Sequence, residues 1–270
     1  MHTITSREHA LFKQLIKLEK SARRRRSDCL TLLDGVHLIQ AYRRAQGLPA
    51  KLIVSESGYQ HPEIRSLVSE ISTNAEVHTV MLSDGLFKQI SPVKTPTGII
   101  ALITIPTTVP NIVNDHQAFC VLLEAIQDPG NLGSILRSAA AAGVSDIYLS
   151  DGCADAWSPK TLRASMGAHF ALTLHEASDL VQVIQRFKYN SNGKVIAAAL
   201  RAPRHLYQVD LKGTIALVFG NEGAGLSQQI LDVIDERIAI PMQGNTESLN
   251  VAAAAAICFF EKMRQQYYGY

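Results

Sequence analysis

Short apolar runs alternate with amphipathic stretches along most of the chain. The runs suit buried strands, and the stretches, whose apolar residues recur every three or four positions, suit helices. In the first stretch, for example, Leu11, Leu15 and Leu18 share one helical face. Strands are expected at Cys29–Leu33, Lys51–Val54, Glu76–Val80, Gly98–Ile103, Ala118–Ala125, Asp146–Leu149, Leu172–Leu174, Lys194–Ala199, Ile215–Phe219 and Arg237–Ile240. Helices are expected at Ser6–Lys20, Asp34–Gln46, after Pro62, and at Asp84–Ile90, Ile135–Ala142, Asp179–Phe187 and Leu249–Arg264.

This alternation predicts an α/β protein with two domains. A segment rich in proline and β-branched residues without periodicity, Pro106–Asn111, reads as a linker. We therefore expect a small α/β domain at residues 1–105, a linker at 106–115 and a second domain at 116–270. Repeated strand–helix units in the second domain favour a parallel sheet with helices on both faces.

Composition narrows the class of protein. With 47% hydrophobic and 19% charged residues, the 270-residue chain reads as an ordinary soluble protein. No apolar run approaches the ~18–20 residues of a membrane helix, and the start has no signal-peptide core, so a cytoplasmic protein without a membrane partner is expected. The four cysteines form no CxxC pair and the nine histidines no HExxH pair, so we expect no metal.

The net charge of +2 is unevenly spread. Residues 1–50 hold ten Lys/Arg against four Asp/Glu, a net +6, which leaves −4 for the rest. Four consecutive arginines, Arg23, Arg24, Arg25 and Arg26, stand within this basic end. Such a run is either a solvated face or a phosphate-binding surface, and clustered arginine favours contact with RNA.

Two polar loops follow strands near the C-terminus. Phe219 leads into Gly220–Gly225, and Ile240 into Pro241–Ser248, with Asn250 just beyond. Strand ends that open into glycine and polar loops are where α/β proteins place their sites. Turn and helix-cap chemistry is the alternative. The glycine spacing is not that of a dinucleotide site and no GxxxxGK[ST] occurs, so a dehydrogenase or a P-loop NTPase is poorly supported.

Three segments in order carry a family resemblance: DPGNLGSILRSAAAAG, VFGNEGAGLS and IPMQGNTESLNVAAAAAI. They resemble motifs one, two and three of the SpoU-type (TrmH-like) branch of the SPOUT RNA methyltransferases, over about residues 118–266. The resemblance implies a parallel-sheet domain with a deep trefoil knot, which base rates alone would not predict. It also implies an N-terminal RNA-binding domain similar to a ribosomal protein fold, and a homodimer.

By this resemblance the protein transfers a methyl group from S-adenosylmethionine to a ribose 2′-hydroxyl, with ribosomal RNA favoured. Transfer RNA as the substrate, or a catalytically silent RNA-binding factor, are the alternatives. Arg137 would assist deprotonation of the hydroxyl, although a guanidinium is an awkward base. The alternative is that Arg137 is an ordinary arginine on a helix surface. The other site residues implied are Asn131, Glu222, Ser248 and Asn250.

The methyl donor needs apolar walls for adenine together with backbone hydrogen bonds. The resemblance assigns these to Leu200, Gly220, Ile240, Met242 and Leu249. Arg163 is a further candidate for RNA contact, with a plain surface arginine as the alternative. Ser248 could also be the N-cap of the last helix. Since no histidine lies in the three segments, a covalent serine mechanism is not expected.

Overall fold

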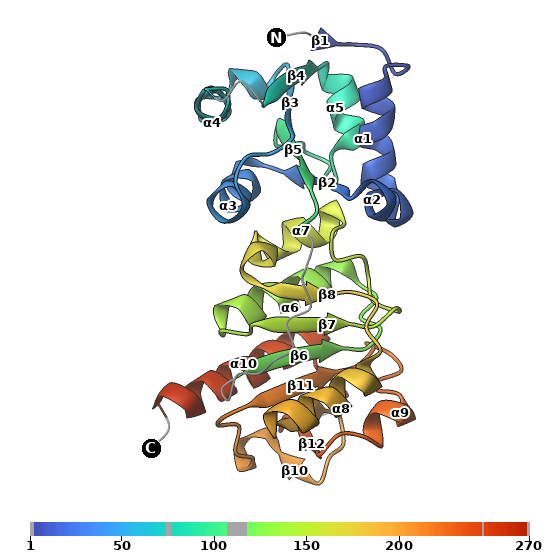
Figure 1. Ribbon diagram of the computed structural model, residues 1–270, viewed down its shortest axis with the longest axis vertical. Coiled ribbons are helices and arrows are strands. Elements are labelled where there is room, and N and C mark those ends of the chain that lie inside the picture. Colours follow the sequence, from blue (N-terminus) through green and yellow to red (C-terminus); the bar gives the residue numbers. More distant parts are fainter. Residues whose placement is uncertain (1–2, 74–76, 107–117, 245, 269–270) are drawn as a thin grey trace. The chain divides into compact units, whose positions relative to one another are not determined.

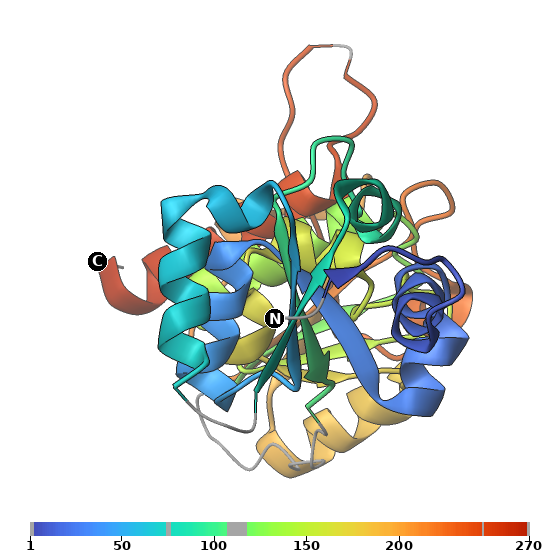
Figure 2. The ribbon, with the colours of Figure 1, turned by 90° about the horizontal axis from the view of Figure 1, so that it is seen from above.

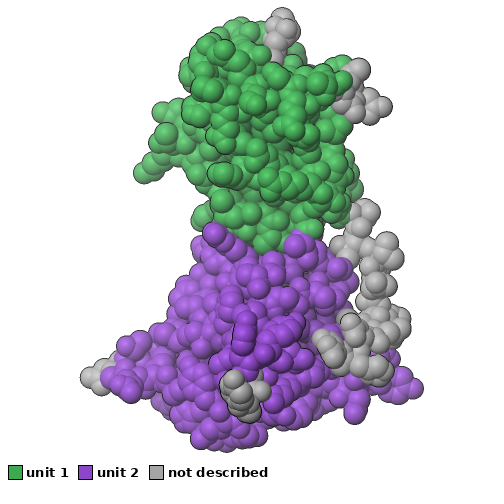
Figure 3. All heavy atoms as spheres, turned by 90° about the vertical axis from the view of Figure 1, so that its left-hand side faces the viewer, with its two compact units in different colours: residues 1–107, 157–170 green, residues 108–156, 171–270 purple. Residues whose placement is uncertain are grey.

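The computed structural model describes residues 3–73, 77–106, 118–244 and 246–268. The described residues fall into two compact units (Figure 3). Unit 1 comprises Met1–Thr107 and Trp157–Phe170, and unit 2 comprises Thr108–Ala156 and Ala171–Tyr270. Trp157–Phe170 therefore packs with the N-terminal residues, although it lies within the range predicted for the second domain. Apart from Pro106, the predicted linker at 106–115 lies outside the described residues.

Unit 1 is built on a mixed five-stranded sheet in the order β1-β4-β3-β5-β2 (Figure 1). β5 runs antiparallel to both β3 and β2, whereas β1, β4 and β3 are mutually parallel. The elements of this unit are β1 (Thr3–Ile4), α1 (Ala10–Lys20), α2 (Ala22–Asp28), β2 (Leu30–Asp34), α3 (Val36–Gln46), β3 (Lys51–Ser55), η1 (Gly58–Gln60), α4 (Pro62–Ile71), β4 (His78–Leu82), α5 (Asp84–Ile90), β5 (Ile99–Thr104) and α7 (Pro159–Ser165).

Helices cover both faces of this sheet, with α3 and α4 on one side and α1 on the other (Figure 2). The α1 side is packed by Leu15, Leu18 and Phe87, which are fully or almost fully buried. The spacing of the leucines along α1 thus produced the face that the sequence predicted.

Unit 2 holds a seven-stranded sheet in the order β10-β12-β9-β11-β6-β7-β8, in which every pair is parallel. The predicted α/β class with a parallel C-terminal sheet is therefore confirmed. Its elements are β6 (Phe119–Leu123), α6 (Pro129–Ala141), β7 (Asp146–Leu149), β8 (Thr173–His175), α8 (Leu180–Ser191), β9 (Lys194–Ala198), β10 (Arg204–His205), η3 (Leu206–Gln208), β11 (Ile215–Phe219), α9 (Gln228–Leu231), β12 (Glu236–Ala239) and α10 (Val251–Tyr268), and the short η2 (Ala168–Ala171) belongs to unit 1 except for its last residue.

The two faces of this sheet are covered by different helices (Figure 1). α8 and α9 pack on one face through Ile184, Phe187 and Ile230. On the other face α10 places Phe259 edge-on against Phe119 and Phe219, with ring centroids 5.8 and 5.6 Å apart. α10 also lies along α6, so the last helix of the chain packs beside the first helix of unit 2.

Polar capping residues set two helix starts that the apolar pattern did not predict. α6 starts at Pro129 and not at Ile135, because the Asp128 carboxylate accepts a hydrogen bond from the Asn131 amide at 2.8 Å and proline suits the first turn. Similarly, the arginine run is itself a helix, α2, which Ser21 caps. Polar capping residues decided both starts. The knot stays a prediction, since residue 245, in the connection from β12 to α10, lies outside the described residues.

Candidate functional site

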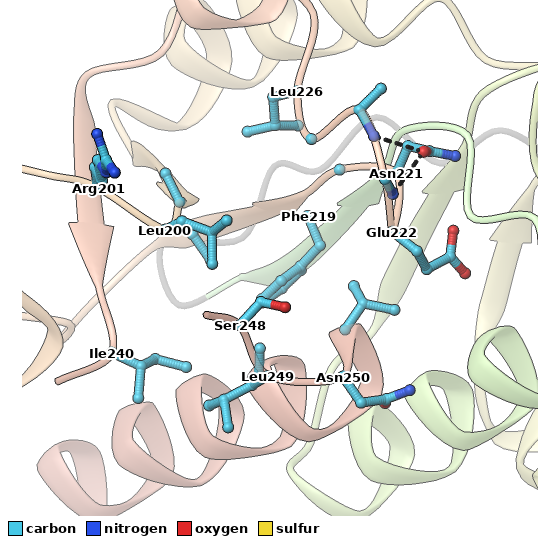
Figure 4. A pocket seen from close by; sticks show the side chains of 18 of the residues that line it. Leu200, Arg201, Phe219, Asn221, Glu222, Leu226, Ile240, Ser248, Leu249 and Asn250 are labelled. Carbon is cyan, nitrogen blue, oxygen red and sulfur yellow. Dashed lines mark hydrogen bonds between the residues drawn. The ribbon is translucent and has the colours of Figure 1, made fainter. Parts of the chain in front are cut away.

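A cavity of about 750 Å³ opens at the carboxyl ends of β9, β11 and β12 in unit 2 (Figure 4). Its middle is apolar, with side chains from Leu200, Phe219 and Leu249 facing inward. The remaining lining residues include Asn131, Arg201, Gly220, Asn221, Glu222, Leu226, Arg237, Ile240, Met242, Glu247, Ser248 and Asn250. In a parallel sheet this edge collects the loops that follow the strands, so residues far apart in sequence meet here.

The turn after β11 is fixed by one asparagine. The Asn221 backbone exchanges two hydrogen bonds with Gly225, at 2.9 and 3.0 Å. Its side-chain oxygen accepts from the amides of Gly223 and Ala224, both at 2.9 Å, while its side-chain nitrogen donates to the Ala125 carbonyl at 2.8 Å. These bonds close the loop on itself and tie it to the chain that follows β6.

Gly220 is where this turn allows no side chain. A Cβ there would lie 2.4 Å from the carbonyl carbon and oxygen of Gly225, closer than real Cβ contacts allow. The main chain of Gly225 fills the space that a side chain at position 220 would occupy, so the turn can close on itself only with glycine there. Gly220 thus contributes main chain alone to the cavity lining.

A chain of hydrogen bonds joins the three polar loops. The Asn250 side-chain nitrogen donates to the Asn131 side-chain oxygen at 2.8 Å, and the Asn131 nitrogen donates to Glu222 Oε1 at 3.0 Å. Glu222 also accepts from the backbone amides of Gln127 and Asp128, both at 3.3 Å. A carboxylate can only accept, so the Asn131 nitrogen must face Glu222 and its oxygen must face Asn250. These hydrogen bonds therefore fix the orientation of both side-chain amides.

Glu222 is held in its ionised form. Burial raises the pKa of this carboxyl, but the hydrogen bonds from Asn131 and from the backbone amides together outweigh burial, so its pKa lies below the ordinary value. A carboxylate at one end of the cavity therefore stays charged at neutral pH. Among the described residues, the donors to Glu222 are Asn131 and backbone amides, and Arg137 is not one of them.

Asn250, and not Ser248, caps α10. The Asn250 side-chain oxygen accepts from the Ala252 and Ala253 amides at 2.9 and 3.3 Å, and α10 begins at Val251. The cap suggested for Ser248 is thus wrong, because the helix starts two residues later than expected. Ser248 instead lines the cavity, with its hydroxyl exposed to it (Figure 4).

Every residue that the resemblance assigned to the methyl donor lines the cavity, namely Leu200, Gly220, Ile240, Met242 and Leu249. Sequence reasoning missed Phe219 and Leu226, which complete the apolar middle, and the cations Arg201 and Arg237. Phe219 is the last residue of a predicted strand, and its place directly before Gly220 was the available signal. The two arginines had none.

Arg137 is apart from this group. It is exposed on α6 and lies outside the cavity lining, and it makes no hydrogen bond or ion pair with any described residue. Six residues along a helix amount to a rise of about 9 Å, which separates it from Asn131. The structure therefore brings together Asn131, Glu222, Ser248 and Asn250 but leaves Arg137 outside the wall.

The predicted RNA-binding arginines differ in exposure. Arg25 is buried at 4% exposure, and its guanidinium donates to the carbonyls of Leu18 and Glu19 at the end of α1. The prediction that Arg25 contacts RNA is therefore wrong, because the residue caps a helix inside unit 1. Arg23, Arg24 and Arg26 are exposed, and Arg24 forms an ion pair with Asp28 at 2.7 Å.

Arg163 also has a protein partner in unit 1. Its Nη1 lies 2.8 Å from Oδ2 of Asp34, whose side chain is 1% exposed. Burial raises the pKa of Asp34, and the hydrogen bond from Thr97 and the charge of Arg163 oppose that rise. Arg163 thus offsets a buried charge while 42% of its side chain stays exposed.

The described residues offer neither a metal site nor a membrane-spanning helix. Within those residues no group of three or more His, Cys, Asp and Glu side chains could hold a metal ion. Nor does any helix among them have the length and apolar character to cross a membrane.

Comparison with known proteins gives three findings. Residues 118–260 match the model of the SpoU rRNA Methylase family. The chain is 32% identical over 272 residues to an uncharacterized tRNA/rRNA methyltransferase of Synechocystis, covering 98% of this chain and 94% of the relative. It is 31% identical over 260 residues to a 23S rRNA (guanosine(2553)-2′-O)-methyltransferase of Bacillus subtilis, with 96% and 98% covered.

A solved structure resembles both units of the chain. The crystal structure of an RNA 2′-O ribose methyltransferase superimposes with a TM-score of 0.84 at 29% identity. The match covers 97% of this chain and 98% of the other. It therefore extends well beyond residues 118–260.

Proposed function

Because the chain belongs to the SpoU rRNA methylase family, we propose that it transfers a methyl group from S-adenosylmethionine to a ribose 2′-hydroxyl in RNA. The observation that carries the proposal is the hydrogen-bonded chain Glu222–Asn131–Asn250 at the edge of the cavity. It unites the three family segments at one point. A catalytically silent relative would not need these three side chains to be hydrogen-bonded to one another.

The cavity suits the donor by its shape and chemistry. The apolar middle at Leu200, Phe219 and Leu249 offers walls for adenine, and Gly220 contributes main chain to the lining. The ionised Glu222 at the cavity would attract the positive charge of the donor's sulfonium. When bound, S-adenosylmethionine supplies an electrophilic methyl group on a sulfonium. Ile240 and Met242 complete the assigned donor contacts.

The residues of this chain then have separate tasks at the 2′-hydroxyl. Asn131 and Asn250 are positioning residues, because their amides are committed to each other and to Glu222 and the α10 cap. Ser248, exposed to the cavity, can accept from or donate to the ribose. Arg137 binds a phosphate or stabilises the developing alkoxide, since a guanidinium is too weak a base to take the proton unaided.

Ribosomal RNA is the proposed substrate, and a guanosine of 23S rRNA is the proposed target, by analogy with the Bacillus relative. The charge of unit 1 supports a polyanionic partner, since it holds 16 Lys/Arg against 9 Asp/Glu. Arg23, Arg24 and Arg26 are the exposed cations assigned to RNA, and Arg163, which already pairs with Asp34, is a further candidate. Such a substrate also favours the cytoplasm as the compartment.

We further propose a homodimer that uses the outer face of α10. Ala253 and Phe260 are seven residues apart, so they lie on the same face of the helix. Both are exposed, Phe260 with 42% of its surface. An exposed phenylalanine on a helix rich in alanine suits close packing against a second copy. Sedimentation of Phe260→Asp beside the wild type tests this proposal.

Methyl transfer from labelled S-adenosylmethionine to 23S rRNA and to transfer RNA tests the function. Arg137→Ala should lose most activity and retain donor binding by calorimetry. The control is Arg186→Ala, which removes an exposed arginine of α8 and should leave the activity unchanged. Absence of both donor heat and transfer in the wild type would favour the silent RNA-binding factor. Labelling of transfer RNA alone would shift the proposed substrate.

A further inference from the structure

We infer that residues 199–208, which run from the end of β9 through β10 and η3, form an RNA-contact surface of unit 2 that holds the strand beside the target nucleotide. We call this stretch the β9–β10 segment. The inference rests on the proposed function, because it assigns the segment to the same RNA substrate.

Unit 2 is acidic overall, yet the segment is basic. Unit 2 contains 10 Lys/Arg against 15 Asp/Glu, a net −5, whereas the segment contains Arg201 and Arg204 and no acidic residue. The charged residues lining the cavity are Arg201, Arg237, Glu222 and Glu247. A polyanion that reaches this cavity must therefore be attracted locally, against the net charge of the unit.

Arg201 lies at the end of the cavity away from Glu222 (Figure 4). Its side chain is exposed and makes no hydrogen bond or ion pair with the residues described here. Arginine presents a planar set of donors that fits a phosphate. The neighbouring Arg204 is occupied, because it forms an ion pair with Glu236 at 2.9 Å. Arg201 is thus the cation of the segment that can serve a ligand.

The segment is held firmly in place. Leu206 is fully buried, and Val209, the residue directly after the segment, is buried and accepts a hydrogen bond from Gln265 of α10 at 3.1 Å. β10 pairs in parallel with β12, and it is the edge strand of the sheet. Residues exposed on this segment are therefore presented in a fixed geometry, which lowers the entropy lost on binding.

Tyr207 is an aromatic side chain left in solvent. It stands on η3 with 60% of its surface exposed, although its neighbour Leu206 is fully buried. His205, also exposed, pairs in register with Ala239, directly before the cavity residue Ile240. Unstacked RNA bases bind to exposed aromatic rings beside basic groups. A cation, a ring and the cavity thus lie along one continuous edge.

The test uses the full chain and a ribosomal RNA fragment, with binding measured directly by filter retention and methyl transfer measured in parallel. The variants are Arg201→Ala, Tyr207→Ala and Tyr207→Phe. Matched controls come from α8 of the same unit, where Arg186 is exposed and Tyr189 is 91% exposed: Arg186→Ala and Tyr189→Ala. Donor affinity is measured by calorimetry, and molecular mass by sedimentation.

Arg201→Ala should weaken RNA binding about threefold to tenfold and lower the salt slope of log affinity by ~0.7–0.9, as one lost phosphate contact does. Tyr207→Ala should weaken RNA binding about fivefold or more, and Tyr207→Phe should retain it, since stacking needs the ring and not the hydroxyl. Controls should bind as the wild type does, and all variants should keep their donor affinity.

Three results would overturn the inference. Equal losses in the α8 controls would show a general charge or surface effect. A loss of donor affinity in Arg201→Ala would assign its guanidinium to the carboxylate of the donor, and a drop in mass in Tyr207→Ala would assign the edge to a second copy of the chain. If the wild type binds RNA but transfers no methyl group, the proposed function fails while the binding comparison still decides this inference.

Discussion

The contact between Asn131 and Glu222 can be tested by reversing its hydrogen bond. In Asn131→Asp the donor that lies 3.0 Å from Glu222 Oε1 becomes a carboxylate oxygen. Two negative charges would then face each other where a hydrogen bond had been. The Asn250 donor keeps its acceptor, because an aspartate oxygen can occupy the position of the Asn131 oxygen.

The separation of these atoms sets the magnitude. At 3.0 Å two unit charges repel by about 1.4 kcal/mol at the dielectric constant of water and by about 5 kcal/mol at an effective value of 20. Glu222 is exposed and Asn131 is half-buried, so a value of ~2 kcal/mol is reasonable for this site. The lost hydrogen bond adds about 1 kcal/mol.

The loss of stability in Asn131→Asp should grow as the pH rises. Repulsion raises the pKa of the new carboxyl pair above the ordinary range, so the pair holds one proton in the folded state at mildly acidic pH. The destabilisation is therefore fully present above that raised pKa and disappears as the pH falls through it. Asn131→Ala, which loses the hydrogen bond without adding charge, should show a loss that stays constant between pH 5 and pH 8, since the lowered pKa of Glu222 lies below this range.

Thermal unfolding and donor calorimetry between pH 5 and pH 8 measure the effect. At pH 8 the midpoint of Asn131→Asp should fall by roughly 5–10 °C, and donor affinity should fall with it. Adding Glu222→Gln should restore part of the loss, because the new amide donates to the carboxylate at position 131 but gives up the hydrogen bond that Glu222 Oε1 accepts from the Asp128 amide. Equal losses for Asn131→Asp and Asn131→Ala at every pH, or no rescue in the double variant, would refute the contact.

Two other changes probe the turn and the arginine run. Gly220→Ala should weaken donor binding by about 1–3 kcal/mol, because its Cβ would lie 2.4 Å from the Gly225 carbonyl and distort the turn. In the control Gly223→Ala the nearest atom to the new Cβ is 3.6 Å away, so calorimetry should show normal donor binding. Arg25→Ala should lower the free energy of unfolding by about 2–4 kcal/mol, since it removes buried donors to two helix-end carbonyls. Arg26→Ala, an exposed neighbour, should stay within about 0.5 kcal/mol in urea unfolding, and equal losses in the two arginine variants would contradict the burial of Arg25.

Most elements whose apolar residues face a core were predicted at the right place, many of them with bounds shifted by one or more residues. Asp84–Ile90, Asp146–Leu149 and Ile215–Phe219 were expected and found at the same residues. Element starts set by polar caps were not, since Asp128 and Asn250 move the beginnings of α6 and α10. Periodicity records which face is buried, and it carries no record of which polar side chain satisfies the first amides.

For the site, the sequence supplied the residues and the fold supplied their partners. The order of the three segments was enough to nominate Asn131, Glu222 and Asn250, because local motifs are written in the chain itself. That Asn131 bonds both of the others, that Arg25 is buried and that Arg137 stands outside the cavity wall are tertiary facts. Contacts between residues more than ninety positions apart depend on how strands order themselves in the sheet. No local pattern of hydrophobic and polar residues specifies that order, so it emerges only when the whole chain has packed.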